Sequence, residues 1–180
     1  RIVFALREPA DRAWSDYRFC YRPHFSESDI SWDAATQASL AAYTRCYRDA
    51  VGHYAANRTA RGDAAGIDAF YGLACAKLFL RRKDPYGLIR KSLYAYQVLN
   101  YQRVFGVDAV TAVTSEQLRA DAAAVGNRVA AFANLCTSFE FEDIEPVHVT
   151  PVKPKAHHYW SKAGYTLLRD WFEPHNRRLY

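Results

Sequence analysis

The chain opens with RIVFALREPADRAWSDY, residues 1–17, which predicts a strand, a turn and the start of a helix. The hydrophobic run Ile2–Leu6 is typical of a strand in the core of a parallel sheet. Arg7 follows at the carboxyl end of this strand, where open α/β sheets bind their ligands, and Pro9 suits the first turn of a helix. Ser15 lies on one face of that helix, so its neutral hydroxyl and the charged Arg7 fork can bind one anion together. The alternative is an ordinary strand-to-helix turn with a solvated arginine.

Length and charge indicate the class of protein and of partner. The 180 residues are 50% hydrophobic, which is enough for one globular domain, residues 1–180, with a core. The net charge is +5 and the sequence pI is about 9.0, so we expect an anionic partner: nucleic acid, acidic membrane, acidic polysaccharide or a phosphorylated cofactor. The longest basic tract is Arg81-Arg82-Lys83, which is too short to favour nucleic acid.

The spacing of cysteine and histidine predicts no metal site. The four cysteines lie far apart, without zinc-type spacing, and disulfides between them stay possible, with open pairing; they are Cys20, Cys46, Cys75 and Cys136. His157 and His158 are adjacent but lack a third ligand. Asn57 begins the sequon Asn-Arg-Thr, an acceptor for N-glycosylation if the chain enters the secretory pathway. No hydrophobic stretch is long enough to cross a bilayer.

The order of the other predicted elements indicates an α/β fold with few strands and much helix. Hydrophobic periodicity and capping residues give these elements. They are a helix to about Asn57 that begins at Asp29 or Ser31, a helix from Tyr86 to Phe105 that stops at Gly106, a strand from Val107 to Val113, a helix from Ala122 to Leu135 that Asp121 caps, and a helix from Ser161 to Phe172 that Pro174 ends. Because the chain starts at Arg1 directly in a strand, we interpret it as a C-terminal fragment.

The opening stretch resembles the 3′-phosphate-binding motif of the carbohydrate sulfotransferases that use 3′-phosphoadenosine 5′-phosphosulfate. The shared pattern is Leu-Arg-x-Pro-x-x-Arg-x-x-Ser-x-Tyr, residues 6–17. Three later segments are similar to the same family in the same order. They are Ser92-Leu93-Tyr94-Ala95 with the following helix, strand and Glu116-Gln117-Leu118, then residues 129–135, and finally the closing residues 167–180. Ser92 stands where the family usually has glycine.

The resemblance implies a helix-rich fragment of a P-loop-like sulfotransferase fold with a small parallel sheet. It implies transfer of a sulfuryl group from 3′-phosphoadenosine 5′-phosphosulfate to a hydroxyl of a glycosaminoglycan-like glycan, without a metal. The branches most similar are the N-acetylgalactosamine 4-sulfate 6-O-sulfotransferases and the heparan sulfate sulfotransferases. Such enzymes are glycoproteins of the Golgi lumen and type II membrane proteins, so the expected partner is an acidic polysaccharide, with a membrane anchor upstream of this chain and no nucleic acid.

The same resemblance implies roles for particular residues. In the family, the residues that match Arg7 and Ser15 hold the 3′-phosphate of the cofactor. Lys153 and Lys155 match a basic loop that covers the nucleotide; this loop lacks the family's glycine, and the alternative is two solvated lysines. Weak candidates for binding the acceptor are Arg22, Arg90 and Lys91, with ordinary surface charge as the alternative.

The catalytic residue is unknown, because the family's glutamate base and 5′-phosphosulfate loop are expected upstream of Arg1. We therefore do not assign Glu8, His24 or Glu116 as the base, and we expect the 180 residues alone to be inactive. Two other function classes stay open. One is a non-catalytic module that binds nucleotide or glycan, and the other is a helical interaction domain whose basic face binds RNA or acidic lipid.

Overall fold

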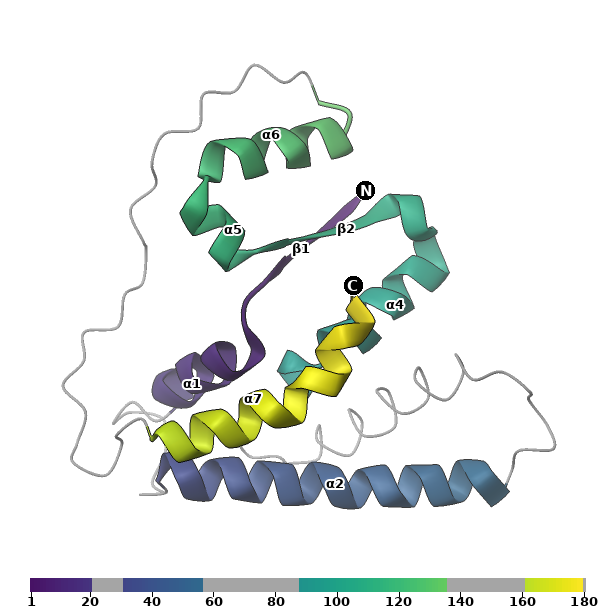
Figure 1. The fold of residues 1–180 in the computed structure, drawn as a ribbon. Coiled ribbons are helices and arrows are strands. Elements are labelled where there is room, and N and C mark those ends of the chain that lie inside the picture. Colours follow the sequence, from purple (N-terminus) through teal and green to yellow (C-terminus); the bar gives the residue numbers. More distant parts are fainter. Residues whose placement is uncertain (21–30, 57–87, 136–160, 180) are drawn as a thin grey trace. The chain divides into compact units, whose positions relative to one another are not determined.

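The computed structural model describes residues 1–20, 31–56, 88–135 and 161–179, drawn in colour in Figure 1. The chain divides into two compact units. The first consists of Arg1–Glu8 and Val98–Val152, and the second of Pro9–Gln97 and Lys153–Tyr180. Each is described by itself below. The prediction of a single domain over residues 1–180 stays a prediction.

The first unit contains a two-stranded parallel sheet, which confirms the predicted α/β class in its coarse form. Strand β1 (Ile2–Leu6) pairs with β2 (Val110–Thr114), with Leu6 opposite Thr114 (Figure 1). β1 has the predicted bounds but not the predicted burial, since its residues alternate between half-buried and exposed, with Val3 38% exposed. The second strand begins at Val110 rather than Val107, because residues 107–109 form a 3-10 turn, η4, after Gly106.

Two helices follow β2 in the described part of the first unit, and local capping sets their bounds. Thr114 and Gln117 form a capping box at the start of α5 (Ser115–Ala120), a helix that the sequence analysis did not predict. Asp121 accepts a 2.8 Å hydrogen bond from the Ala124 N–H at the start of α6 (Ala122–Phe132), as predicted. The prediction that α6 reaches Leu135 is wrong. Asn134 adopts a φ of 58°, and the Leu135 N–H bonds back to the Ala130 carbonyl at 2.9 Å, which is the Schellman turn that ends a helix.

The second unit is helical. α1 (Pro9–Cys20) and α2 (Trp32–Ala56) each pack against α7 (Lys162–Asn176), and α1 also contacts the 3-10 turn η3 (Arg90–Ser92). A further 3-10 turn, η5 (Arg177–Leu179), follows α7. The core between these elements is aromatic and aliphatic. Its fully buried large side chains include Tyr17, Trp32, Tyr43, Leu88, Ile89, Leu168 and Phe172.

The second unit confirms one predicted cap and corrects one predicted helix end. Ser31 accepts a hydrogen bond from the Ala34 N–H at 3.2 Å and so caps α2; Asp29 lies outside the described residues. α7 does not end at Phe172. Pro174 lies inside its last turn, where the missing N–H costs one hydrogen bond to an exposed stretch of backbone and does not stop the helix.

The predicted helix 86–105 is also divided. Leu93, with φ −84° and ψ 66°, breaks the helical path after η3, and α4 (Tyr94–Phe105) begins beyond it. Gly106, with a φ of 89°, ends α4 as predicted, since its N–H bonds to the Gln102 carbonyl at 2.8 Å.

Two further facts bear on the class of protein. Cys46 of α2 is buried and disulfide-bonded, and the side chains of the other three cysteines are outside those described. Within the described ranges, no helix combines the length and the hydrophobicity that a membrane span requires.

Candidate functional site

Arg7 lies where the sequence predicts a ligand site, at the carboxyl end of β1. Because the two strands are parallel and in register, the chain leaves both at the same edge of the sheet, after Leu6 and after Thr114. The Arg7 side chain is half-buried, and its Nε is buried without a hydrogen-bond partner. Among the described residues, no carboxylate forms an ion pair with it. A half-buried guanidinium without a counter-charge is suited to binding an anion.

Glu116 lies at the same edge of the sheet and stays ionised. Its Oε1 accepts hydrogen bonds from the Glu8 N–H at 3.4 Å and from the Ser115 hydroxyl at 3.0 Å. Burial acts to raise the pKa of Glu116, but hydrogen bonds from its own N–H, from Glu8 and from the hydroxyls of Ser115 and Thr114 lower it overall. A carboxylate with a lowered pKa is a poor general base near neutral pH, which agrees with leaving Glu116 unassigned.

Ser15 lies on α1 in the second unit, and its side chain is exposed. The buried residues Ala10, Ala13 and Tyr17 form the core-facing side of the same helix. At 3.6 residues per turn, Ser15 points roughly away from that side. Arg7 belongs to the first unit and Ser15 to the second. That both residues bind one anion therefore stays a prediction.

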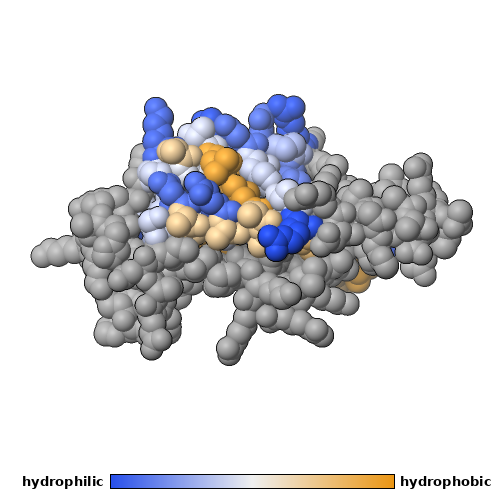
Figure 2. All heavy atoms as spheres, turned by 90° about the horizontal axis from the view of Figure 1, so that it is seen from below, coloured by the Kyte–Doolittle hydropathy of each residue, from blue (hydrophilic) through white to orange (hydrophobic). Residues whose placement is uncertain are grey.

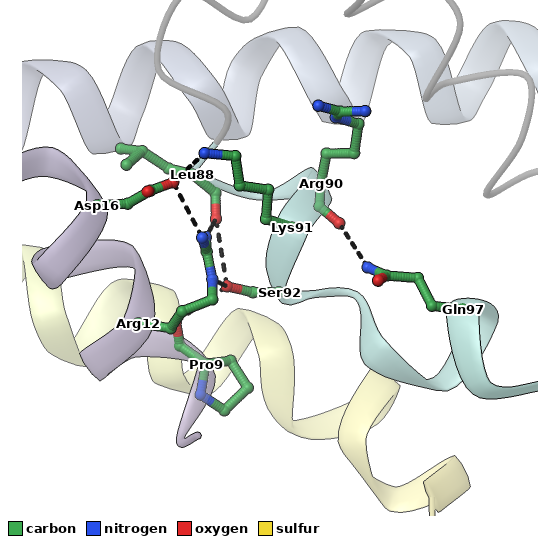
Figure 3. A network of polar contacts seen from close by, with 8 residues as sticks. All are labelled: Pro9, Arg12, Asp16, Leu88, Arg90, Lys91, Ser92 and Gln97. Carbon is green, nitrogen blue, oxygen red and sulfur yellow. Dashed lines mark hydrogen bonds and ion pairs between the residues drawn. The ribbon is translucent and has the colours of Figure 1, made fainter. Parts of the chain in front are cut away.

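Arg12, which belongs to the same motif as Arg7 and Ser15, donates hydrogen bonds to other residues of the protein. Its Nε donates to Ser92 Oγ at 2.5 Å, its Nη2 to the Leu88 carbonyl at 2.5 Å and its Nη1 to Asp16 Oδ2 at 3.0 Å. The hydrogen bonds of Pro9, Arg12, Asp16, Leu88, Lys91 and Ser92 form one set, which we call the Arg12 network (Figure 3). Three of the five guanidinium N–H groups of Arg12 thus donate to the protein, and its charge is paired with Asp16, which makes Arg12 less available to a ligand than Arg7.

The Arg12 network could not be found from the sequence, apart from one signal. Arg12 and Asp16 are spaced i, i+4 on a predicted helix, a spacing typical of ion pairs. Ser92 and Leu88 are 80 and 76 residues away from Arg12. No local pattern predicts a partner at that separation.

The two described candidates for acceptor binding, Arg90 and Lys91, differ in whether their charge is paired. Lys91 Nζ is 2.8 Å from Asp16 Oδ2, so its charge is paired. Arg90 is half-buried, and its Nε is buried without a hydrogen-bond partner. Figure 3 shows its guanidinium apart from the Arg12 network. Of these two residues, Arg90 is therefore the one suited to bind an anion.

Several predicted residues lie outside the described part of the chain. They are Arg22, His24, Asn57, Lys153, Lys155, His157 and His158. Within that part, no three side chains of His, Cys, Asp or Glu gather into a group that could hold a metal ion. On the face drawn in Figure 2, hydrophilic residues border a small hydrophobic area. Mixed surfaces of this kind are ordinary, so this area assigns no function.

Comparison with known proteins adds no relative. Searches with the chain find no matching family model, no matching curated protein and no matching solved structure. The assignment of function therefore depends on the motifs of the sequence and on the geometry of Arg7, Ser15 and Arg90.

Proposed function

We propose that this chain forms the 3′-phosphate-binding side of a carbohydrate sulfotransferase that uses 3′-phosphoadenosine 5′-phosphosulfate. The observation that carries the proposal is the position of Arg7, half-buried at the carboxyl end of a parallel strand, with a buried Nε that has no partner. A buried N–H without a hydrogen-bond partner costs free energy, which an anion bound to the guanidinium would recover in part. The ordered sequence motifs support the 3′-phosphate of the cofactor as this anion.

In this proposal the residues of the chain bind and orient; they do not perform chemistry. The cofactor supplies the sulfuryl group, which passes to a glycan hydroxyl while adenosine 3′,5′-bisphosphate leaves. Arg7 neutralises the 3′-phosphate, and Ser15 donates a hydrogen bond from its exposed hydroxyl. Lys153 and Lys155 are proposed to cover the nucleotide. The base that accepts the hydroxyl proton is expected upstream of Arg1.

The proposed acceptor is an acidic polysaccharide. Two features support this choice: the net charge of +5 and the guanidinium of Arg90, which has no counter-charge among the described residues. The disulfide at Cys46 and the sequon at Asn57 fit an oxidising secretory compartment. The proposed location is therefore the Golgi lumen, with a membrane anchor upstream of this chain.

The experiment is calorimetric titration of adenosine 3′,5′-bisphosphate into the full-length protein. Arg7→Ala should weaken binding by about 2 kcal/mol, or about 30-fold in Kd, because it removes a charged hydrogen-bond partner. Arg103→Ala is the matched control, since Arg103 is an exposed arginine of α4 in the same unit, and it should leave Kd within twofold.

Two results would contradict the proposal. One is a wild-type protein that does not bind the nucleotide, which would favour a basic interaction domain. The other is equal affinity of wild type and Arg7→Ala. Binding without transfer of sulfate to a desulfated glycosaminoglycan would instead identify a non-catalytic binding module.

A further inference from the structure

The Arg12 network fixes the first two turns of α1 to η3. Ser92 is fully buried, and its hydroxyl lies 3.1 Å from the Pro9 carbonyl and 3.3 Å from the Leu88 carbonyl. It can donate its proton to either carbonyl while it accepts from Arg12 Nε. One buried side chain of η3 thus contacts two residues of the α1 helix, Pro9 and Arg12.

Asp16 extends the same contact by one helical turn. Its Oδ2 accepts from Arg12 Nη1 at 3.0 Å and from Lys91 Nζ at 2.8 Å. The side chains of Arg12 and Asp16 are 17% and 18% exposed, so their bond is shielded from water in part, whereas the Lys91 side chain is 46% exposed and its bond to Asp16 is closer to a surface pair. Together with Ser92, they hold α1 against rotation about its own axis.

Ser15 lies between Arg12 and Asp16 in the sequence, on the same two turns. Rotation of α1 would change the direction of the Ser15 hydroxyl, which is a short donor with little reach of its own. We propose that Ser92 and Arg12 are positioning residues that fix this direction for the 3′-phosphate. This inference rests on the proposed function. The inference also gives a reason for serine at position 92. Glycine there would remove the hydroxyl that bonds to Arg12 Nε and to the Pro9 carbonyl.

The test compares two probes, adenosine 3′,5′-bisphosphate and adenosine 5′-monophosphate, titrated into the full-length protein. The ratio of their Kd values isolates the contribution of the 3′-phosphate. Ser92→Ala should lower the preference for the bisphosphate about fivefold, because the hydrogen bond from Ser15 to the phosphate would be misdirected and lose part of its strength. Arg12→Lys, which keeps the charge but loses the fork, should lower it to a similar extent.

Ser39→Ala is the matched control. Ser39 is 1% exposed and belongs to α2 in the same unit, so its loss should reduce stability without changing the ratio. In a Ser15→Ala background, Ser92→Ala should give no further loss of preference, because the residue acts through Ser15.

Each other outcome overturns the inference. The inference is wrong if the ratio of Kd values is unchanged in both Ser92→Ala and Arg12→Lys. It is also wrong if these variants weaken the binding of both nucleotides equally, because that result would mean a structural role alone. A full further loss in the Ser15→Ala background also contradicts action through Ser15. These results leave the proposed function intact. A wild-type protein with no preference for the bisphosphate would refute the proposed function and the inference together.

Discussion

Gly164 lies in the first turn of α7, where this helix passes close to the start of α2. A Cβ built on Gly164 would lie 2.5 Å from Asp33 Oδ1 and 2.7 Å from Trp32 Nε1. Trp32 is 1% exposed and packs in the core of the second unit. Asp33 Oδ1 accepts a hydrogen bond from the hydroxyl of Ser161, the residue that caps α7. Gly164→Ala should therefore push apart two contacts that join α7 to α2.

The expected loss of stability follows from three contributions. Overpacking at a buried position costs about 1–3 kcal/mol. A disturbed hydrogen bond between Asp33 and Ser161 costs about 1 kcal/mol more. The higher helix propensity of alanine offsets about 1 kcal/mol. Gly164→Ala should thus lower the free energy of unfolding by about 2 kcal/mol.

Urea unfolding followed by tryptophan fluorescence measures this loss, because all the tryptophans belong to the sequence of the second unit. Ala163→Gly is the control. Ala163 is the exposed neighbour in the same turn, so its substitution measures the contribution of helix propensity there without a clash. A Gly164→Ala protein as stable as the wild type, or more stable, would show that helix propensity decides at this position and would refute the close packing of α7 on α2.

Two further predictions concern the first unit. The pKa of Glu116 is lowered from its ordinary 4.5, so the ionised carboxylate stabilises the fold above pH 4.5, and this stabilisation is lost as pH falls through the lowered pKa. The difference in free energy of unfolding between wild type and Glu116→Gln should therefore shrink as pH falls below 4.5. A difference that stays constant down to pH about 2 would contradict this prediction. Asn134 has a φ of 58°, so Asn134→Gly should stabilise by about 0.5 kcal/mol and Asn134→Ala should destabilise by about 1 kcal/mol. Circular dichroism during urea unfolding measures both, and the opposite order of the two variants would argue against the Schellman turn.

Features with local causes were predicted correctly from the sequence. β1 has its predicted bounds because a hydrophobic run and a following Arg-x-Pro turn define it. Ser31, Asp121 and Gly106 act as predicted because a cap depends on the side chain and on the backbone within four residues.

Features with distant causes were not predicted. The break at Leu93 separates η3 from α4 where the Leu88 carbonyl is bonded to Arg12, 76 residues earlier in the chain. Pro174 was expected to end α7, but α7 continues through it to Asn176. The buried side chains of Leu168 and Phe172 hold α7 to the core, and this packing is sufficient to offset one missing hydrogen bond at the helix end.

Arg7, Arg12 and Arg90 differ in whether their guanidinium N–H groups already donate to protein oxygens. The sequence analysis matches Arg7 to the 3′-phosphate and gives Arg90 as a candidate for acceptor binding, whereas Arg12 belongs to the motif without an assigned role. In the structure, Arg12 donates from all three guanidinium nitrogens to protein oxygens, whereas the buried Nε atoms of Arg7 and Arg90 have no partner. A guanidinium that already donates to the fold from three of its five N–H groups, and whose charge is paired with a carboxylate, gains less free energy on binding an anion. Loss of Arg12 should therefore act through the packing of α1, and loss of Arg7 directly through the proposed contact with phosphate.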